Sequence, residues 1–296
     1  MASRGRTVGL AFGLIAGVVL VFLATVWVLM AVLEDGAFPG GARVAVVEVE
    51  GLIVSGDDVV RDLKEHAENP AVRAVVVRVN SPGGVVAPTQ EIVGAIHRVR
   101  QTGKPVVASL GAVAASGGYY VATAADRIYA NPGTLTGSIG VLMQLANVEG
   151  LLKRVGVEYV VVKAGAYKDV GSLARAMSPE ERRILQTLLD DVYGQFVAAV
   201  AAGRGLDREV VLGFADGRIY SGQQAQKLRM VDELGGFEDA VDGAAKLANI
   251  TGKPRLIFPR RKFSVSEWVR SQVGIPSASH FIPSLPALKT PLYLMD

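Results

Sequence analysis

The apolar and polar positions divide the chain into an uncharged first segment, a body of alternating elements and a proline-rich end. Residues 7–33 carry no charged side chain. A helix of this length exceeds the roughly 20 residues needed to cross a hydrocarbon core of about 30 Å, and core helices of soluble domains usually keep a polar face. We therefore expect a transmembrane signal anchor over 7–33, between a short N-terminus (1–6) and a linker (34–42).

The charges that flank this segment predict its orientation. Arg4 and Arg6 precede it, and Glu34 and Asp35 follow it, so the positive-inside rule places the N-terminus in the cytoplasm. The rest of the chain would then lie outside the cell membrane, after a single pass. A cleavable secretory signal is the alternative. It is less favoured because its apolar region runs about 7–15 residues before a small-x-small site.

The body of the chain alternates between short β-branched runs and amphipathic stretches. Because the strand runs are continuous rather than alternating, they indicate a mainly parallel sheet covered on both faces, in one α/β domain over 43–252. The expected strands are 44–54, 71–80, 105–110, 127–130 and 158–165, and the expected helices are 57–67, 89–99, 114–125, 178–202, 221–228 and 236–248.

The last segment, 253–296, differs in composition from the body. It begins with a basic stretch at 259–262 and contains four prolines between residues 276 and 291. Prolines at this density disfavour helix and central strand, so we expect an extended or disordered tail. A linker, a cleaved segment and a ligand for the protein's own groove are all compatible with it.

Composition narrows the chemistry. There are 31 basic and 28 acidic residues, so the net charge of +3 gives no nucleic-acid footprint. Cysteine is absent, which excludes disulfides, cysteine nucleophiles and thiolate metal sites. We expect no metal or other cofactor. Only three histidines are available as general bases or ligands: His66, His97 and His280.

Two glycine-rich turns follow predicted strands, NSPGG at 80–84 and ASGG at 115–118. Ligands of parallel sheets gather at the carboxyl ends of the strands, so both turns should lie at the functional edge. Ser116 would begin a helix there, where unpaired N–H groups and the helix dipole favour developing negative charge. This suits a nucleophile. A structural N-cap is the competing interpretation.

A nucleophilic serine needs a base. Each of the three histidines lies in a segment typical of a solvated face or in the proline-rich tail. A lysine can serve instead where burial lowers its pKa, and serine–lysine pairs are an established variant of the triad. Lys168 is the candidate, because it follows a predicted strand among small residues. An exposed lysine that pairs with Asp169 is the alternative interpretation.

Four ordered motifs carry a resemblance to a known family: NSPGG (80–84), GAVAASGGYY (111–120), ANPGTLTGSIGV (130–141) and AGAYKDVGS (164–172). Over residues 43–250 the chain resembles the signal peptide peptidase A family of membrane serine proteases, in its single-domain form. The resemblance implies a crotonase/Clp-protease-like fold with Ser116 as nucleophile and Lys168 as general base. It further implies oxyanion donors at the N–H groups of Gly83 and Gly117 and a helper hydroxyl at Ser138.

The same resemblance implies a serine endopeptidase that degrades remnant signal peptides and other unfolded or membrane-bound peptides. It also implies a ring-like homo-oligomer in which serine and lysine can come from neighbouring protomers. The alternatives are a related membrane protease acting on a specific membrane-protein partner, acyl-CoA chemistry on the same fold, and a non-catalytic membrane scaffold.

Overall fold

The computed structural model describes residues 17–27, 42–259 and 292–294, and the chain divides into two units after Gly41. In the first unit, residues 17–27 are helical. Among the described residues, no helix combines the length and the apolar character that crossing a membrane requires. The rest of the predicted anchor, 7–16 and 28–33, lies outside the described residues, as do 1–6 and 34–41 of the flanking segments.

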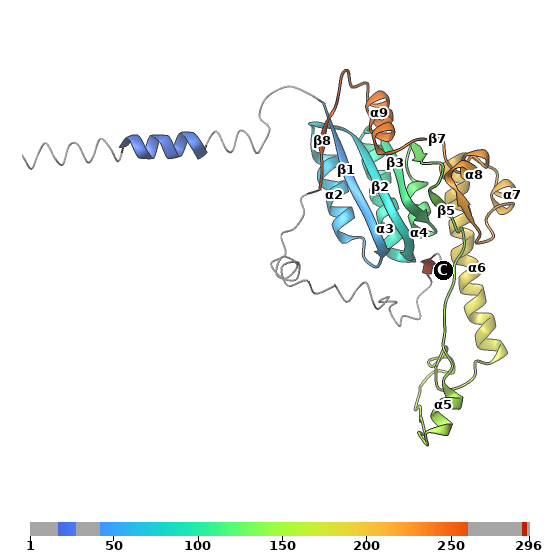
Figure 1. Ribbon diagram of the computed structural model, residues 1–296. Coiled ribbons are helices and arrows are strands. Elements are labelled where there is room, and N and C mark those ends of the chain that lie inside the picture. Colours follow the sequence, from blue (N-terminus) through green and yellow to red (C-terminus); the bar gives the residue numbers. More distant parts are fainter. Residues whose placement is uncertain (1–16, 28–41, 260–291, 295–296) are drawn as a thin grey trace, which may run out of the picture. The chain divides into compact units, whose positions relative to one another are not determined.

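The second unit is built on a mainly parallel, mixed β-sheet (Figure 1). The described strands follow the spatial order β6-β5-β3-β2-β1-β8, with β4 beside β3 and β7, and β9 beside β2. All pairs are parallel except β5 with β6 and β2 with β9. The α/β class with a mainly parallel sheet is therefore confirmed, and this sheet is consistent with the expected crotonase/Clp-like fold.

The elements run in this order along the second unit: β1 (Arg43–Ile53), α2 (Asp57–Glu68), β2 (Val72–Val85), α3 (Val86–Gln101), β3 (Val106–Ala115), α4 (Gly117–Ala122), β4 (Arg127–Ala130), β5 (Leu135–Gly137), α5 (Glu149–Arg154), α6 (Pro179–Arg204), α7 (Arg208–Leu212), β6 (Ile219–Ser221), α8 (Gly222–Lys227), β7 (Glu233–Leu234), α9 (Phe237–Leu247), β8 (Arg255–Ile257) and β9 (Leu292–Leu294).

Both faces of the sheet are covered, because successive side chains of a strand point to opposite faces. Val75 and Val77 of β2 belong to the larger apolar core, which also takes side chains from α2, α3, α4 and α6. Val76, the residue between them, belongs to a smaller core under α9. The continuous valine run of β2 is thus explained by burial on both sides.

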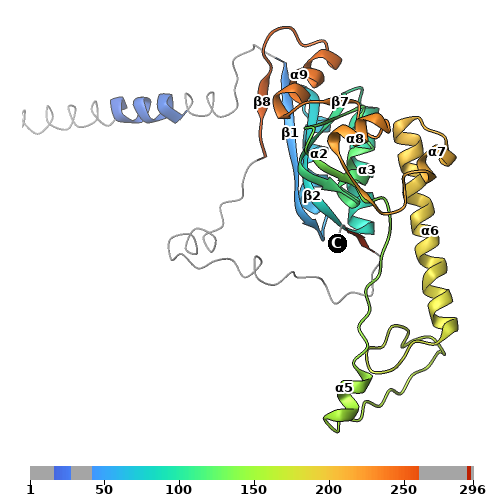
Figure 2. The same cartoon turned by 45° about the vertical axis from the view of Figure 1, so that its right-hand side comes forward.

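Helix α6 is the longest described helix, with 26 residues, and its sequence explains both of its ends. Ser178 and Glu181 form a capping box at the start, Pro179 occupies the first turn, and Gly205 ends the helix in a left-handed conformation. Its C-terminal half packs on α4, where the rings of Tyr120 and Phe196 lie 5.0 Å apart in edge-to-face contact. Its N-terminal half extends beyond the sheet (Figures 1 and 2).

One predicted strand is wrong. Residues 158–165 form no strand in the structure. They belong to a segment between β5 and α6, residues 143–177, that we name the arm. Figures 1 and 2 show the arm, with α5 inside it, beyond the N-terminal end of α6 and away from the sheet. Val160 and Val162 are 74% and 96% exposed, so the apolar run is present but has no strand to pair with among the described residues.

The tail does contain short extended segments. Arg255–Ile257 pair with β1 as β8, and Leu292–Leu294 pair antiparallel with β2 at Gly83–Val85 as β9. Residues 260–291 lie outside the described residues.

Candidate active site

The two glycine-rich motifs lie side by side at the carboxyl ends of β2 and β3, as the sequence predicts, but NSPGG belongs to β2 and is not a turn. The close approach involves backbone atoms: a Cβ added at Gly117 would lie 3.2 Å from both the Gly83 Cα and the Gly84 N. At the next residue, a Cβ at Gly118 would lie 2.7 Å from the carbonyl oxygen of Ser81. Only glycine permits this contact between α4 and β2.

Ser116 connects β3 directly to α4 in a strained conformation. Its φ is 51° and its ψ is −117°, a combination that L-residues rarely adopt. Such strain persists where the surroundings impose it, and it is concentrated at functional sites. Ser116 is fully buried, its side chain makes no capping hydrogen bond, and its Oγ has no hydrogen-bond partner among the described residues. The structural N-cap interpretation therefore fails.

Helix α4 is shorter than predicted: it spans Gly117–Ala122 instead of 114–125. A helix of six residues has a weak dipole, so the position of its first N–H group matters more here than the dipole does. Gly117 is the first residue of the helix, where an N–H group has no intrahelical acceptor. Its N–H is thus placed to donate to an oxyanion formed at Ser116.

Ser138 lies beside Ser116 across the pairing of β3 with β5. Ala115 is in register with Gly137, and the Ser116 N–H donates to the Gly137 carbonyl at 2.8 Å. Ser138, like Ser116, has a positive φ, of 50°, and it is almost fully buried. A cavity of about 760 Å³ opens at Ser138, between the segment that follows β5 and the side chains of α6. The structure therefore brings Ser116, Gly117, Gly83 and Ser138 together, and Ser138 lines the neighbouring cavity.

Ser81 is a site residue that the sequence analysis missed. It is fully buried, and its Oγ accepts a hydrogen bond from the Gly83 N–H at 3.1 Å. The N–H predicted to donate to an oxyanion therefore has an internal acceptor in the resting site. The signal was present in NSPGG, where a serine precedes the glycine pair by two residues, the spacing of a side-chain-to-backbone turn.

The two histidines that the structure describes, His66 and His97, do not approach Ser116. The carbonyl of His66 accepts a hydrogen bond from Lys104 Nζ at 2.8 Å, just before β3 begins. Ser116 lies past the other end of β3, whose 10 residues span roughly 33 Å at about 3.3 Å per residue. His97 lines a surface cavity with the same Lys104. His280 lies outside the described residues.

Lys168 lies on the arm and is exposed. The last residues of the arm lie next to the N-terminal end of α6, where Arg175 donates to Glu181. Phe196, which packs on α4, follows Glu181 by 15 residues along α6. At about 1.5 Å per residue, this separation is roughly 22 Å. Within one copy of the chain, the structure therefore does not bring Lys168 to Ser116.

These features define the class of the protein. A buried serine at a strained strand-to-helix turn, beside glycine N–H groups and with no histidine next to it among the described residues, is the arrangement of a serine hydrolase with a different base.

Comparison with known proteins identifies the family. The model of Peptidase family S49 matches residues 98–251. A Synechocystis protein named "Putative protease slr0021" is 50% identical over 210 residues, which are 70% of this chain and 75% of that protein. The "Putative signal peptide peptidase SppA" of Enterococcus faecium is 40% identical over 189 residues, 64% of this chain and 55% of that protein. "Protease 4" of Salmonella typhi is 37% identical over 219 residues, 71% of this chain and 35% of that protein.

The chain belongs to Peptidase family S49. The resemblance stated from the motifs is thereby confirmed, and so is the enzyme class: a serine protease with a Ser–Lys dyad.

Proposed function

We propose that this protein is a membrane-anchored endopeptidase in which Ser116 attacks the peptide bond and Lys168 is the general base, and that it degrades signal peptides left in the membrane after secretion. The observation that carries the site assignment is the buried Oγ of Ser116, which lies at a strained turn and has no hydrogen-bond partner in the described part of the chain. This hydroxyl caps no helix, and its proton is committed to no acceptor among the described residues, so a base that reaches it meets no competing hydrogen bond.

In the first step, the neutral Lys168 amine accepts the Ser116 hydroxyl proton as Oγ bonds to the substrate carbonyl carbon. The negative charge that develops on the carbonyl oxygen is met by the Gly117 N–H and by the Gly83 N–H, once the latter leaves Ser81. The lysine then returns the proton to the leaving amine, and water releases the acyl group by the same route. Ser138, beside Ser116, supplies a hydroxyl to orient the lysine.

Lys168 reaches Ser116 from a second copy of the chain. This step of the proposal is supported by the exposed position of Lys168 on the arm and by the roughly 22 Å of helix between the base of the arm and α4. The exposed valines of the arm also favour burial against a neighbour. A contact of this kind, repeated head to tail, closes into a ring.

The β2 edge next to Ser116 accepts an extended chain. Strand β9 pairs antiparallel there, with Leu294 opposite Gly83 and Leu292 opposite Val85. A peptide that joins a sheet edge binds through its backbone, so this mode suits unfolded chains of varied sequence. Signal peptides, as free apolar segments in the membrane, satisfy this requirement.

A mixing experiment tests the shared site. Ser116→Ala and Lys168→Ala are each expected to be inactive, whereas their mixed oligomers are expected to regain activity at the interfaces where an intact serine meets an intact lysine. With random mixing this is roughly a quarter of the interfaces. Lys153→Ala, another lysine of the arm, is the control and should stay active. If the mixture stays inactive although mass spectrometry shows mixed oligomers, the shared site is refuted.

The anchor and its orientation are tested separately. Because the chain has no cysteine, single cysteines at Ser3 and Lys253 report their own accessibility. In intact cells, a membrane-impermeant maleimide should label Lys253→Cys and leave Ser3→Cys unlabelled, and carbonate washing should leave both in the membrane fraction. The opposite labelling pattern, or release by carbonate, would overturn this part of the proposal.

A further inference from the structure

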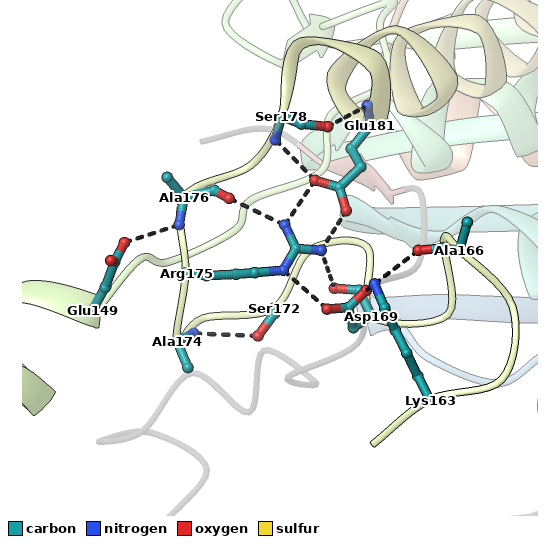
Figure 3. A network of polar contacts seen from close by, with 10 residues as sticks. All are labelled: Glu149, Lys163, Ala166, Asp169, Ser172, Ala174, Arg175, Ala176, Ser178 and Glu181. Atoms are coloured by element: carbon teal, nitrogen blue, oxygen red, sulfur yellow. Dashed lines mark hydrogen bonds and ion pairs between the residues drawn. The ribbon is translucent and has the colours of Figure 1, made fainter. Parts of the chain in front are cut away.

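A network of ion pairs and hydrogen bonds includes Ala166 and Asp169, which flank Lys168 in the sequence (Figure 3). Asp169, the next residue, pairs with Lys163 through one carboxylate oxygen and with the Arg175 Nε, at 2.9 Å, through the other. Lys163 also donates to the Ala166 carbonyl at 2.8 Å. Lys168 is exposed, as the alternative interpretation expects, but among the described residues the ion-pair partners of Asp169 are Lys163 and Arg175 and not Lys168.

Arg175 joins the turn of Lys168 to the long helix. Its Nη1 donates to Glu181 Oε2 at 2.9 Å, and its Nη2 pairs with the other oxygen of Glu181. Glu181 is almost fully buried and belongs to the capping box of α6 with Ser178. A guanidinium fork between two carboxylates fixes both distance and angle, which a lysine cannot do. The turn of Lys168 is thereby held against the N-terminal end of α6.

The network is also balanced in charge. The hydrogen bonds from Arg175, followed by that from Lys163, lower the pKa of Asp169 well below its usual range, and Arg175 lowers the pKa of Glu181 to about 2. Both carboxylates are therefore ionised at neutral pH, and they match the two cations. Glu149 of α5, which accepts from the Ala176 N–H at 3.0 Å, is balanced by Lys153. Each carboxylate of the network thus has a cationic partner.

We infer that Arg175 is a positioning residue for Lys168: it fixes the lysine's turn to α6 and neutralises the Asp169 carboxylate, which would otherwise hold a proton on the neighbouring amine. The inference rests on the proposed role of Lys168 as general base. A base must lose its proton before it acts, and an uncompensated carboxylate beside it opposes that loss.

The test is the pH dependence of the rate at which a fluorophosphonate probe labels the intact protein, with oligomeric state checked by native mass spectrometry. Arg175→Ala leaves one excess negative charge, so the pH at half-maximal rate should rise, by roughly 0.5–1 unit. Asp169→Asn leaves one excess positive charge, so this midpoint should fall by a similar amount. A purely structural role would lower the rates without moving the midpoints in opposite directions.

Two further variants separate charge from geometry. Arg175→Lys keeps the charge and loses the fork, so the labelling rate should fall on the order of tenfold while the midpoint stays at the wild-type pH. Arg183→Ala is the matched control, because Arg183 is an exposed arginine of α6 that pairs only with Glu180 among the described residues. It should change neither quantity.

The pH midpoints of the variants decide whether Arg175 acts on Lys168 through charge. Midpoints that move in opposite directions support the inference. Midpoints that stay at the wild-type pH, or move together, overturn it even where the rate falls. If Arg175→Ala does not assemble, Asp169→Asn and Arg175→Lys still decide. If Lys168→Ala labels at the wild-type rate, the proposed dyad fails, and this result is distinct from a failure of the network.

Discussion

The contact between Gly117 and the end of β2 gives a sharp test of how the site is built. In Gly117→Ala, the new Cβ would lie 3.2 Å from the Gly83 Cα and from the Gly84 N. Favourable carbon contacts lie at about 3.5–4.0 Å, so the first turn of α4 must move from β2 by roughly 0.3–0.8 Å. Catalytic groups tolerate about 0.5 Å of displacement, so this shift misaligns the two oxyanion donors.

The expected effect is large on rate and moderate on stability. The rate of fluorophosphonate labelling should fall by about two to three orders of magnitude, as after the loss of one oxyanion donor. The unfolding free energy should fall by about 1–3 kcal/mol, the usual cost of an overpacked methyl group. Both are measured on the full-length protein, the second by urea denaturation.

Gly194→Ala is the matched control. Gly194 lies inside α6, and a Cβ there would have no heavy atom within 4 Å. Alanine favours the helix over glycine, so this variant should be more stable by about 0.5–1 kcal/mol and should label at the wild-type rate. If Gly117→Ala were folded and labelled as fast as wild type, the assignment of the oxyanion donors to Gly83 and Gly117 would be refuted.

Two further predictions concern stability. Phe196→Ala should lower the unfolding free energy by about 3–5 kcal/mol, because a buried ring packed on Tyr120 is replaced by a cavity; a loss below about 1 kcal/mol in urea denaturation would contradict this packing. Burial lowers the pKa of His66, so below about pH 6.5 the unfolded chain takes up a proton that the folded one does not, and stability falls as the pH drops from about 7.5 to 5.5. His66→Gln should make the thermal midpoint less dependent on pH in this window, and an unchanged dependence would count against the buried neutral imidazole.

The sequence predicts the central sheet well because its strands are buried on both faces. The continuous valine runs of β1 and β2 and the small residues of β3 are typical of strands buried on both faces. The apolar pattern alone therefore locates these strands. It also places the two glycine-rich turns at one edge, since the carboxyl ends of parallel strands meet there.

The end of β2 was harder to predict. The SPGG motif suggests that the strand stops, but β2 continues to Val85, with Gly83 and Gly84 paired to Leu52 and Ile53 of β1. A Cβ at Gly84 would lie 2.1 Å from the Ile53 carbonyl oxygen. These glycines thus allow the backbones of β1 and β2 to come close together. Local sequence propensity does not distinguish this use of glycine from a turn.

The arm was mispredicted for a different reason. Residues 158–165 have the composition of a strand, but a strand needs a neighbour, and none lies beside them in the described part of one chain. The position of Lys168 depends on the side chain of Arg175. The partners of this arginine, Asp169 and Glu181, are each six residues away from it in the sequence. Sequence pattern does not predict such a contact, although the capping box at Ser178 and Glu181 is visible in it.

The most direct test of the central claim is to locate the site of covalent labelling. Intact protein would be treated with a fluorophosphonate probe and digested, and the modified residue would be identified by mass spectrometry in wild type, Ser116→Ala and Lys168→Ala. The account predicts that wild type is labelled at Ser116 and that both variants are unlabelled while still assembled. Labelling at another serine, or undiminished labelling of Ser116 in Lys168→Ala, would contradict it.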